Sequence, residues 1–247
     1  KGSKMNLFHY KLDTLTNGTR YYYEVKLEGG ATCKASFKTL SEKPDQIRLI
    51  TLSDSHIFAT RAELDQAIKK FDPDLLLHCG DMVEGTGAQA EQFSFWFQGK
   101  VETDYIHSYP VVYSSGNHDQ GGVYFNTYVY SIQDEEYGAE VEGDSSFNYA
   151  GLHIITMNSN PWGLFQMNSE ATGQKADAAT IKTIDNAMNW LKKDLATDAA
   201  KNADFRLIFM HHPVSDAYTK RYIPAVIEPG KVDLLLSGHT HSYARAV

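Results

Sequence analysis

Gly238-His-Thr-His241 is the last of five short polar segments that each follow an apolar run typical of a buried β-strand. The other four, in chain order, are Asp54-Ser-His56, Gly80-Asp81, Gly116-Asn-His-Asp119 and His211-His-Pro213. Together they hold six of the ten histidines, a concentration that random placement would rarely give. Carboxylate, amide and imidazole groups all bind metal ions. The pattern therefore predicts a hydrolytic centre built around two metals.

The apolar runs before these segments predict the strands of a largely parallel sheet. They cover residues 48–52, 75–79, 111–114, 206–210 and 232–237. Helix-like segments lie between several of them, and a parallel connection needs a crossover of that length. Open sheets of this kind collect their ligands at the carboxyl ends of the strands. The predicted fold class is α/β, with all five polar segments at one sheet edge.

Other stretches complete the predicted catalytic domain. A capping-box pattern at residues 60–63 begins one amphipathic helix, and the apolar period over residues 181–195 predicts a second. Residues 146–156 predict a hairpin that extends the sheet. Residues 120–145 and 157–179 lack a steady period, which is typical either of substrate-selecting loops or of ordinary surface insertions.

Spacing within two of the segments brings ligands together in pairs. Asp54 and His56 are two residues apart, as are His239 and His241, so in an extended chain both side chains of a pair leave on the same side. The ligand types include no thiolate. They suit Mn, Fe, Zn or Co and do not distinguish among these metals.

The ordered motifs Asp-x-His, Gly-Asp, Gly-Asn-His-Asp, His-x-Pro and Gly-His-x-His resemble the calcineurin-like metallophosphoesterase superfamily over roughly residues 47–247. The resemblance implies a β-sandwich flanked by helices and a centre of two metal ions. It also implies the ligands of each ion. One ion would be bound by Asp54, His56, Asp81 and His241, and the other by Asp81, Asn117, His211 and His239, with Asp81 bridging.

Such a centre suits hydrolysis of a phosphate mono- or diester. Two ions about 3.5–4 Å apart activate a bridging hydroxide and neutralise the oxygens of an in-line phosphoryl displacement. His118 is then the candidate to protonate the leaving alkoxide, and Asp119 the candidate to orient His118. The alternative is a non-catalytic relative whose metal pocket binds a phosphorylated ligand. The His118-Asp119 pair argues against that alternative.

The remaining histidines are expected to be ordinary core or surface residues, since a lone histidine after a strand is more often hydrogen-bonded than a ligand. They are His9, His78, His107 and His153. His212 stays open between two interpretations. Either it faces the substrate, or it completes the turn before Pro213.

Composition limits the class of partner. A net charge of −8 argues against a non-specific binder of nucleic-acid polymers, which would need a basic face. No apolar run approaches the roughly 18 residues of a membrane span. A small phosphoester is therefore the expected partner, attracted by the cations of the site and not by the acidic surface. Cys79 lies in an apolar run and is expected to be an inert buried thiol.

Residues 1–44 differ from the expected catalytic domain at 45–247. A turn at Asn17-Gly18 precedes alternating residues that include Tyr21 and Tyr23, and Gly29-Gly30 leads into a second strand. This pattern resembles the last strands of a fibronectin type III-like sandwich. A plain hairpin that serves as a lid or spacer is the alternative.

A partial sandwich before such a domain, together with the ending Gly-His-Thr-His-Ser-Tyr243, resembles the purple acid phosphatases, which implies export. Two positions depart from those enzymes. Glu84 stands where they have an iron-binding tyrosine, and His56 follows the wider superfamily. The departures predict a divalent metal pair without a tyrosinate ligand. Related domains continue with further strands, so the resemblance also implies more chain after Val247.

Overall fold

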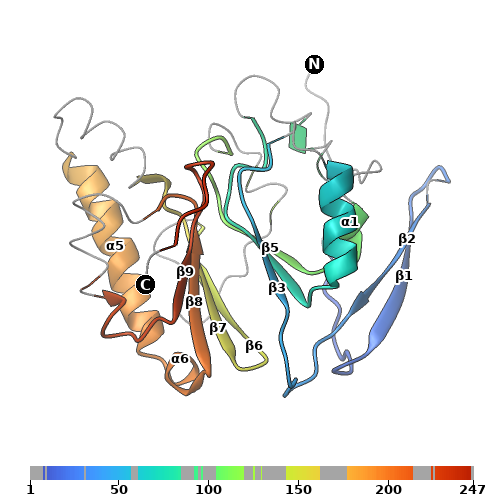
Figure 1. Cartoon of the computed structure of the whole chain (residues 1–247), viewed down its shortest axis with the longest axis horizontal. Coiled ribbons are helices and arrows are strands. Elements are labelled where there is room, and N and C mark those ends of the chain that lie inside the picture. Colours follow the sequence, from blue (N-terminus) through green and yellow to red (C-terminus); the bar gives the residue numbers. More distant parts are fainter. Residues whose placement is uncertain are drawn as a thin grey trace.

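The computed structural model of the chain is drawn in Figure 1, and it describes residues 8, 10–30, 32–56, 61–84, 92–93, 96, 104–119, 125, 129, 143–161, 177–213, 224 and 226–245. In chain order the described elements are β1 (Arg20–Lys26), β2 (Thr32–Lys38), β3 (Leu49–Leu52), α1 (Arg61–Phe71), β4 (Leu75–His78), η1 (Asp104–His107), β5 (Val111–Tyr113), β6 (Ser145–Tyr149), β7 (Leu152–Met157), α5 (Ala178–Leu195), α6 (Asp198–Asn202), β8 (Phe205–Met210) and β9 (Leu234–Leu236). All the strands predicted before the polar segments are confirmed, to within one or two residues at each end.

Two sheets carry the catalytic part. The first has the order β3-β4-β5 and is parallel throughout, with Leu49 opposite Leu75 and Leu76 opposite Val111. The second has the order β6-β7-β8-β9, in which the predicted hairpin β6–β7 is antiparallel and the other pairs are parallel. The parallel character is confirmed, and the strands are divided between two sheets that face each other (Figure 1).

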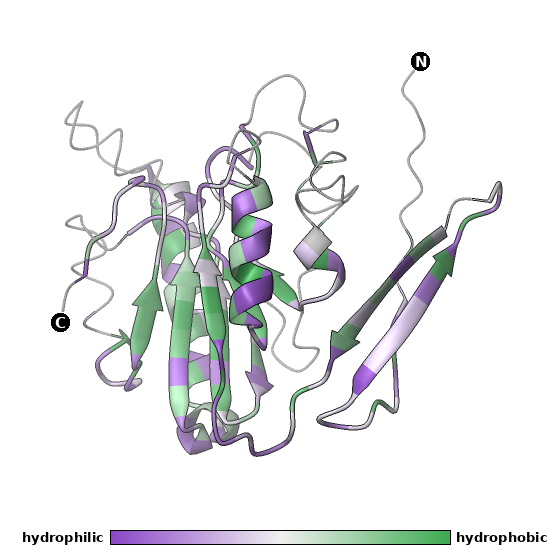
Figure 2. Ribbon diagram, turned by 45° about the vertical axis from the view of Figure 1, so that its right-hand side comes forward, coloured by the Kyte–Doolittle hydropathy of each residue, from purple (hydrophilic) through white to green (hydrophobic). Residues whose placement is uncertain are grey.

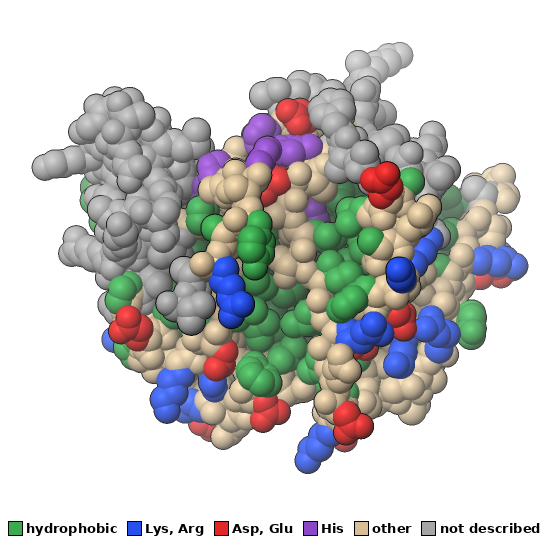
Figure 3. All heavy atoms as spheres, in the orientation of Figure 1, with side chains coloured by type: hydrophobic (Ala, Val, Ile, Leu, Met, Phe, Trp, Pro, Cys, Tyr) green, Lys and Arg blue, Asp and Glu red, His purple; other side chains and the backbone are tan. Residues whose placement is uncertain are grey.

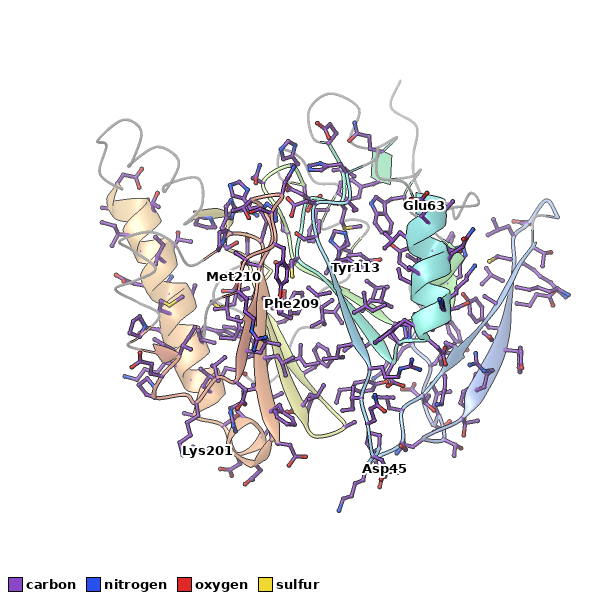
Figure 4. The ribbon with its side chains drawn as sticks, in the orientation of Figure 1. Asp45, Glu63, Tyr113, Lys201, Phe209 and Met210 are labelled. Carbon is purple, nitrogen blue, oxygen red and sulfur yellow. The ribbon has the colours of Figure 1, made fainter. Side chains whose placement is uncertain are left out.

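Three apolar clusters hold the layers together. Between the sheets, Leu77 of β4 packs in one cluster with Ile154 of β7 and Phe209 of β8. Alternate residues of β8 face opposite ways, so that Phe209 points toward the first sheet and Met210 joins the cluster under α5 (Figure 4). Strands β3, β4, β7, β8 and β9 are accordingly apolar along most of their length (Figure 2). Each fully buried side chain of this size stabilises the fold by roughly 1.5–3 kcal/mol.

The helices cover the outer faces of the two sheets. In α5, Ile184, Met188, Leu191 and Leu195 form the buried stripe that the helical period predicted, and Asp177 caps the helix by accepting from the Thr180 amide at 2.7 Å. On the other side, Ile68 of α1 packs with η1 and β4. The predicted helices are confirmed, and the described order of layers is helix, sheet, sheet, helix. This is the α/β fold, a sandwich flanked by helices, that the sequence predicted.

Some expectations fall outside the described residues. Thr60 of the capping box does, and so do most residues of the stretches 120–145 and 157–179. Among the helices that the structure describes, none has both the length and the apolar composition needed to cross a membrane.

The N-terminal hairpin is confirmed as two antiparallel strands, with Arg20 opposite Lys38. Tyr21 stacks on Phe37 across it, with ring centroids 5.7 Å apart. The Tyr23 hydroxyl donates to the His107 carbonyl at 2.7 Å, which ties the hairpin to η1 beside the catalytic part. Its kinship with fibronectin type III sandwiches and the boundary at residue 44 stay predictions.

Candidate metal centre

The predicted ligands gather where strands of both sheets end. Asp54 follows β3, Asp81 follows β4 and Asn117 follows β5, while His211 and His239 follow β8 and β9 of the second sheet. Figure 3 shows histidine side chains clustered at this end of the molecule. The two sheets therefore bring the five segments into one place, as the argument from carboxyl ends predicted.

One group of possible metal ligands consists of Asp54, His56 and His241. The Nε2 atoms of His56 and His241 are 3.4 Å apart, and His241 Nε2 is 3.2 Å from Asp54 Oδ1. Ligands about 2.0–2.2 Å from a shared ion lie roughly 3–3.5 Å from one another, so the spacing suits a metal. Asp54 Oδ1 is also buried and makes no hydrogen bond in the described part of the chain. A cation between these atoms would satisfy it.

The second group surrounds His211 Nε2. His211 Nδ1 faces the Cys79 carbonyl at 2.8 Å, and because a carbonyl only accepts, Nδ1 carries a proton. In the neutral ring, the form that binds a metal, Nε2 then presents its lone pair. That lone pair faces Asn117 Oδ1 at 3.0 Å, Asp81 Oδ2 at 3.3 Å and His239 Nδ1 at 3.2 Å. The Asn117 and Asp81 oxygens are acceptors, so at these distances they repel the lone pair unless a cation lies among them. The donor set again suits Mn, Fe, Zn or Co.

Asp81 lies between the two groups. It shares a third set of possible ligand atoms with Asp54 and His211, the arrangement expected of a bridging carboxylate. Burial opposes ionisation of Asp81, but His211 and His118 outweigh it and lower the pKa of the carboxyl. Burial likewise disfavours charge on His211, and Asp81 more than compensates, so the pKa of His211 is raised. The lowered pKa of Asp81 and the raised pKa of His211 both indicate a pocket that attracts positive charge.

The backbone brings the ligands together in a way that the sequence argument did not anticipate. Asp54, His56, Asp81, His239 and His241 all have positive φ, between 38° and 72°. The expectation that each pair lies in extended chain is therefore wrong. Left-handed turns direct the side chains inward, a strained conformation that concentrates at functional sites.

Glycines make room for these turns. A Cβ on Gly116 would lie 2.1 Å from Asp81 Oδ1. A Cβ on Gly238 would lie 1.7 Å from Ser53 Oγ and 2.5 Å from Asp54 Oδ2. Because real atoms do not approach so closely, any side chain here displaces a ligand. These two glycines are required by the close approach of the chain.

His118 lies at the rim of the centre. Its Nδ1 donates to the Glu84 carbonyl at 2.5 Å, and its Nε2 is 4.0 Å from Asp81 Oδ2. The side chain is 38 % exposed, so a substrate can reach it. His118 thus lies beside the candidate ligands, and its role as the acid stays a prediction.

The expected role of Asp119 needs correction. Its carboxylate is fully buried and accepts from four backbone N–H groups, those of Asp81, Met82, Val83 and Gly116, at 2.8–3.3 Å. The group that His118 Nδ1 contacts is the Glu84 carbonyl. Asp119 therefore fixes the two ligand loops after β4 and β5 to each other and does not orient His118.

His212 and Ser159 form a pair that the motifs did not reveal. The Ser159 hydroxyl accepts from the His212 amide at 2.9 Å and lies 3.0 Å from His212 Nδ1. Burial lowers the pKa of His212 to about 3, so the ring is neutral, and it packs 4.5 Å from the His239 ring. A signal existed, because Asn158-Ser-Asn160 is a polar run directly after apolar β7.

Two of the histidines expected to be ordinary, His78 and His153, are confirmed as buried and hydrogen-bonded, while His9 lies outside the described residues. His78 is buried and lies 3.0 Å from the Ser55 hydroxyl, and His153 pairs with Asp194 at 2.8 Å in the core. Cys79 is buried as predicted, and burial raises the pKa of its thiol to about 12.

Comparison with known proteins identifies the family of the chain. Residues 47–243 match the family model for the calcineurin-like phosphoesterases. The fold is similar to that of a dimetal phosphatase from Danio rerio, with a TM-score of 0.52 and 11 % identity over 79 % of this chain and 82 % of that one. A phosphopantetheinyl hydrolase from Mycobacterium tuberculosis gives a TM-score of 0.42, again with 11 % identity, over 79 % and 83 % of the two chains. A search of curated proteins found no significant match. The family match covers most of the sequence, so the chain belongs to the calcineurin-like phosphoesterase family and is a binuclear metallophosphoesterase.

Proposed function

We propose that the chain hydrolyses phosphate mono- or diesters of small molecules at this centre. The observation that carries the proposal is the convergence of the predicted ligands into two adjoining groups of lone-pair donors with Asp81 between them. Two ions bound there would supply an activated hydroxide and neutralise phosphoryl oxygens. Phosphate would be attracted by this local positive charge although the chain as a whole is acidic.

The protein's own groups have separate tasks in this proposal. Asp54, His56 and His241 bind at one position, and Asn117, His211 and His239 bind at the other, with Asp81 shared. His118 is the acid for the leaving alkoxide and acts in its doubly protonated form. Its Nδ1–H donates to the Glu84 carbonyl, and the proton that passes to the alkoxide comes from Nε2, which lies toward the centre. General acid catalysis of this kind contributes about 10²–10⁴-fold.

The proposal keeps only part of the resemblance to purple acid phosphatases. A carboxylate at Glu84 and an imidazole at His56 give the first position no phenolate. We therefore propose divalent ions at both positions. The hairpin at residues 20–38 would be the remnant of a fibronectin type III-like segment, seated on η1 through Tyr23.

The test begins with chelator-treated protein, to which Mn²⁺, Zn²⁺, Fe²⁺ or Co²⁺ is returned before assay with nitrophenyl phosphate and bis-nitrophenyl phosphate. Activity should return with about two metals per chain. Asp81→Ala and Asp81→Asn should lower metal content and abolish hydrolysis, because both positions share that carboxylate. Asp45→Asn, a change at an exposed position away from the centre, is the control. Normal turnover in an Asp81 variant with two metals bound would refute the assignment.

A further inference from the structure

Glu84 contacts both His56, a predicted metal ligand, and His118, the predicted acid. Its carboxylate Oε2 lies 3.2 Å from His56 Nδ1, and its main-chain carbonyl accepts from His118 Nδ1 at 2.5 Å. The rings of His56 and His118 meet edge to face, with centroids 5.0 Å apart. The side chain of Glu84 is 45 % exposed, so its position is not forced by the packing of the core.

The contacts of His56 determine which of its nitrogens can bind a metal. Nδ1 faces two acceptors, the Glu84 carboxylate and the Val83 carbonyl, both at 3.2 Å. A carbonyl cannot donate, so Nδ1 carries the ring proton. Nε2 then presents its lone pair toward His241 Nε2, 3.4 Å away. The ring is thus held in the tautomer that the first metal position requires.

We propose that Glu84 is a positioning residue for the first metal ion. Its carboxylate holds the Nδ1–H of His56, fixes the orientation of the ring and increases the basicity of Nε2, as outer carboxylates do for metal-binding histidines in general. The inference deepens the proposed function and rests on it. It assigns a task to the side chain that stands where the purple enzymes have their tyrosine.

A direct metal–Glu84 bond is the competing arrangement, since His56, Glu84 and His118 could together hold an ion. The geometry favours positioning. Glu84 Oε2 approaches Nδ1 of His56, whereas Asp54 and His241 lie on the Nε2 side of the same ring. One neutral imidazole offers only one lone pair, so it cannot serve an ion on each side.

Calorimetric titration of metal-free protein with Mn²⁺ or Zn²⁺ separates the two arrangements. Glu84→Ala should weaken one of two binding events by about 10–100-fold and leave the other unchanged, the usual effect of losing an outer partner of a ligand. Glu84→Gln should recover part of that loss, because its amide oxygen still accepts from Nδ1–H. Glu28→Ala, at an exposed glutamate of the hairpin turn, is the matched control.

Each outcome decides the point. Unchanged affinity at both positions in Glu84→Ala would overturn the proposal, as would a glutamine variant no better than alanine, which is the result expected of a direct carboxylate ligand. Thermal unfolding of the metal-free variants should match that of the wild type, because Glu84 is half-exposed. Two metals bound by a wild type that hydrolyses no phosphoester would refute the proposed function alone, since the effect of Glu84 is read from affinity.

Discussion

Replacing Asp119 by asparagine tests whether this residue is a structural anchor or part of the acid pair. Oδ1 accepts from the Met82 and Val83 amides, and Oδ2 accepts from those of Asp81 and Gly116. An asparagine must turn its NH₂ group toward one of these two pairs. Two buried N–H groups then lose their acceptor at about 1–3 kcal/mol each, so unfolding free energy should fall by about 2–6 kcal/mol.

The assay is urea unfolding in the presence of a chelator, so that metal binding does not contribute. Burial raises the pKa of the Asp119 carboxyl to about 7, although its N–H donors favour ionisation. The measurement is therefore made at pH 8, above that pKa. Asp45→Asn, at an exposed position, should change stability by less than about 0.5 kcal/mol. A fully stable Asp119→Asn protein that loses turnover would refute this reasoning and restore the orienting role.

Two further predictions concern the glycines and a buried acid. Gly238→Ala should reduce metal content in purified protein while leaving the far-UV spectrum unchanged, because its Cβ would displace Ser53 and Asp54; normal metal content would show that the turn relaxes. Burial raises the pKa of Asp144 to about 7. Since the unfolded carboxyl titrates near 4, the folded state binds the extra proton between these values, and stability should fall as pH rises from about 4 to about 7. In urea unfolding, Asp144→Asn should reduce the difference in unfolding free energy between pH 5 and pH 8. An unchanged difference would count against this role of Asp144.

The sequence predicts the framework of this protein because its signals are local. Apolar runs bounded by glycine or aspartate mark β3, β4 and β8, and the stripe from Ile184 to Leu195 marks α5. The ligand segments could be predicted for the same reason, since each comes directly after a strand in the sequence. Such motifs can be found without knowing how the sheets pack.

What the sequence could not supply depends on contacts between distant segments. The left-handed φ of Asp54 and His239 could not be predicted from residue type. Asp and His adopt this conformation more often than most residues other than glycine, but they do so at only a small share of their positions. Asp119 follows His118 in sequence, which suggested that the two side chains pair. Its carboxylate oxygens instead accept from backbone N–H groups of the loop after β4, 35 or more residues earlier in the chain. The contact between Glu84 and His56 likewise joins loops from two different strands.

In each of the two central carboxylates, one oxygen is held by hydrogen bonds and the other faces the candidate metal ligands. Asp54 Oδ2 accepts from the His239 amide at 2.8 Å and from the Ser53 hydroxyl at 2.6 Å, which leaves Oδ1 facing His241. Asp81 Oδ1 accepts from the His118 amide at 2.8 Å, which leaves Oδ2 facing His211. In both cases a backbone N–H from another ligand segment orients the carboxylate, so the donor is itself part of the centre. Because that donor is a main-chain group, the orientation depends on the turns that the neighbouring glycines permit and only indirectly on which side chains the motifs contain.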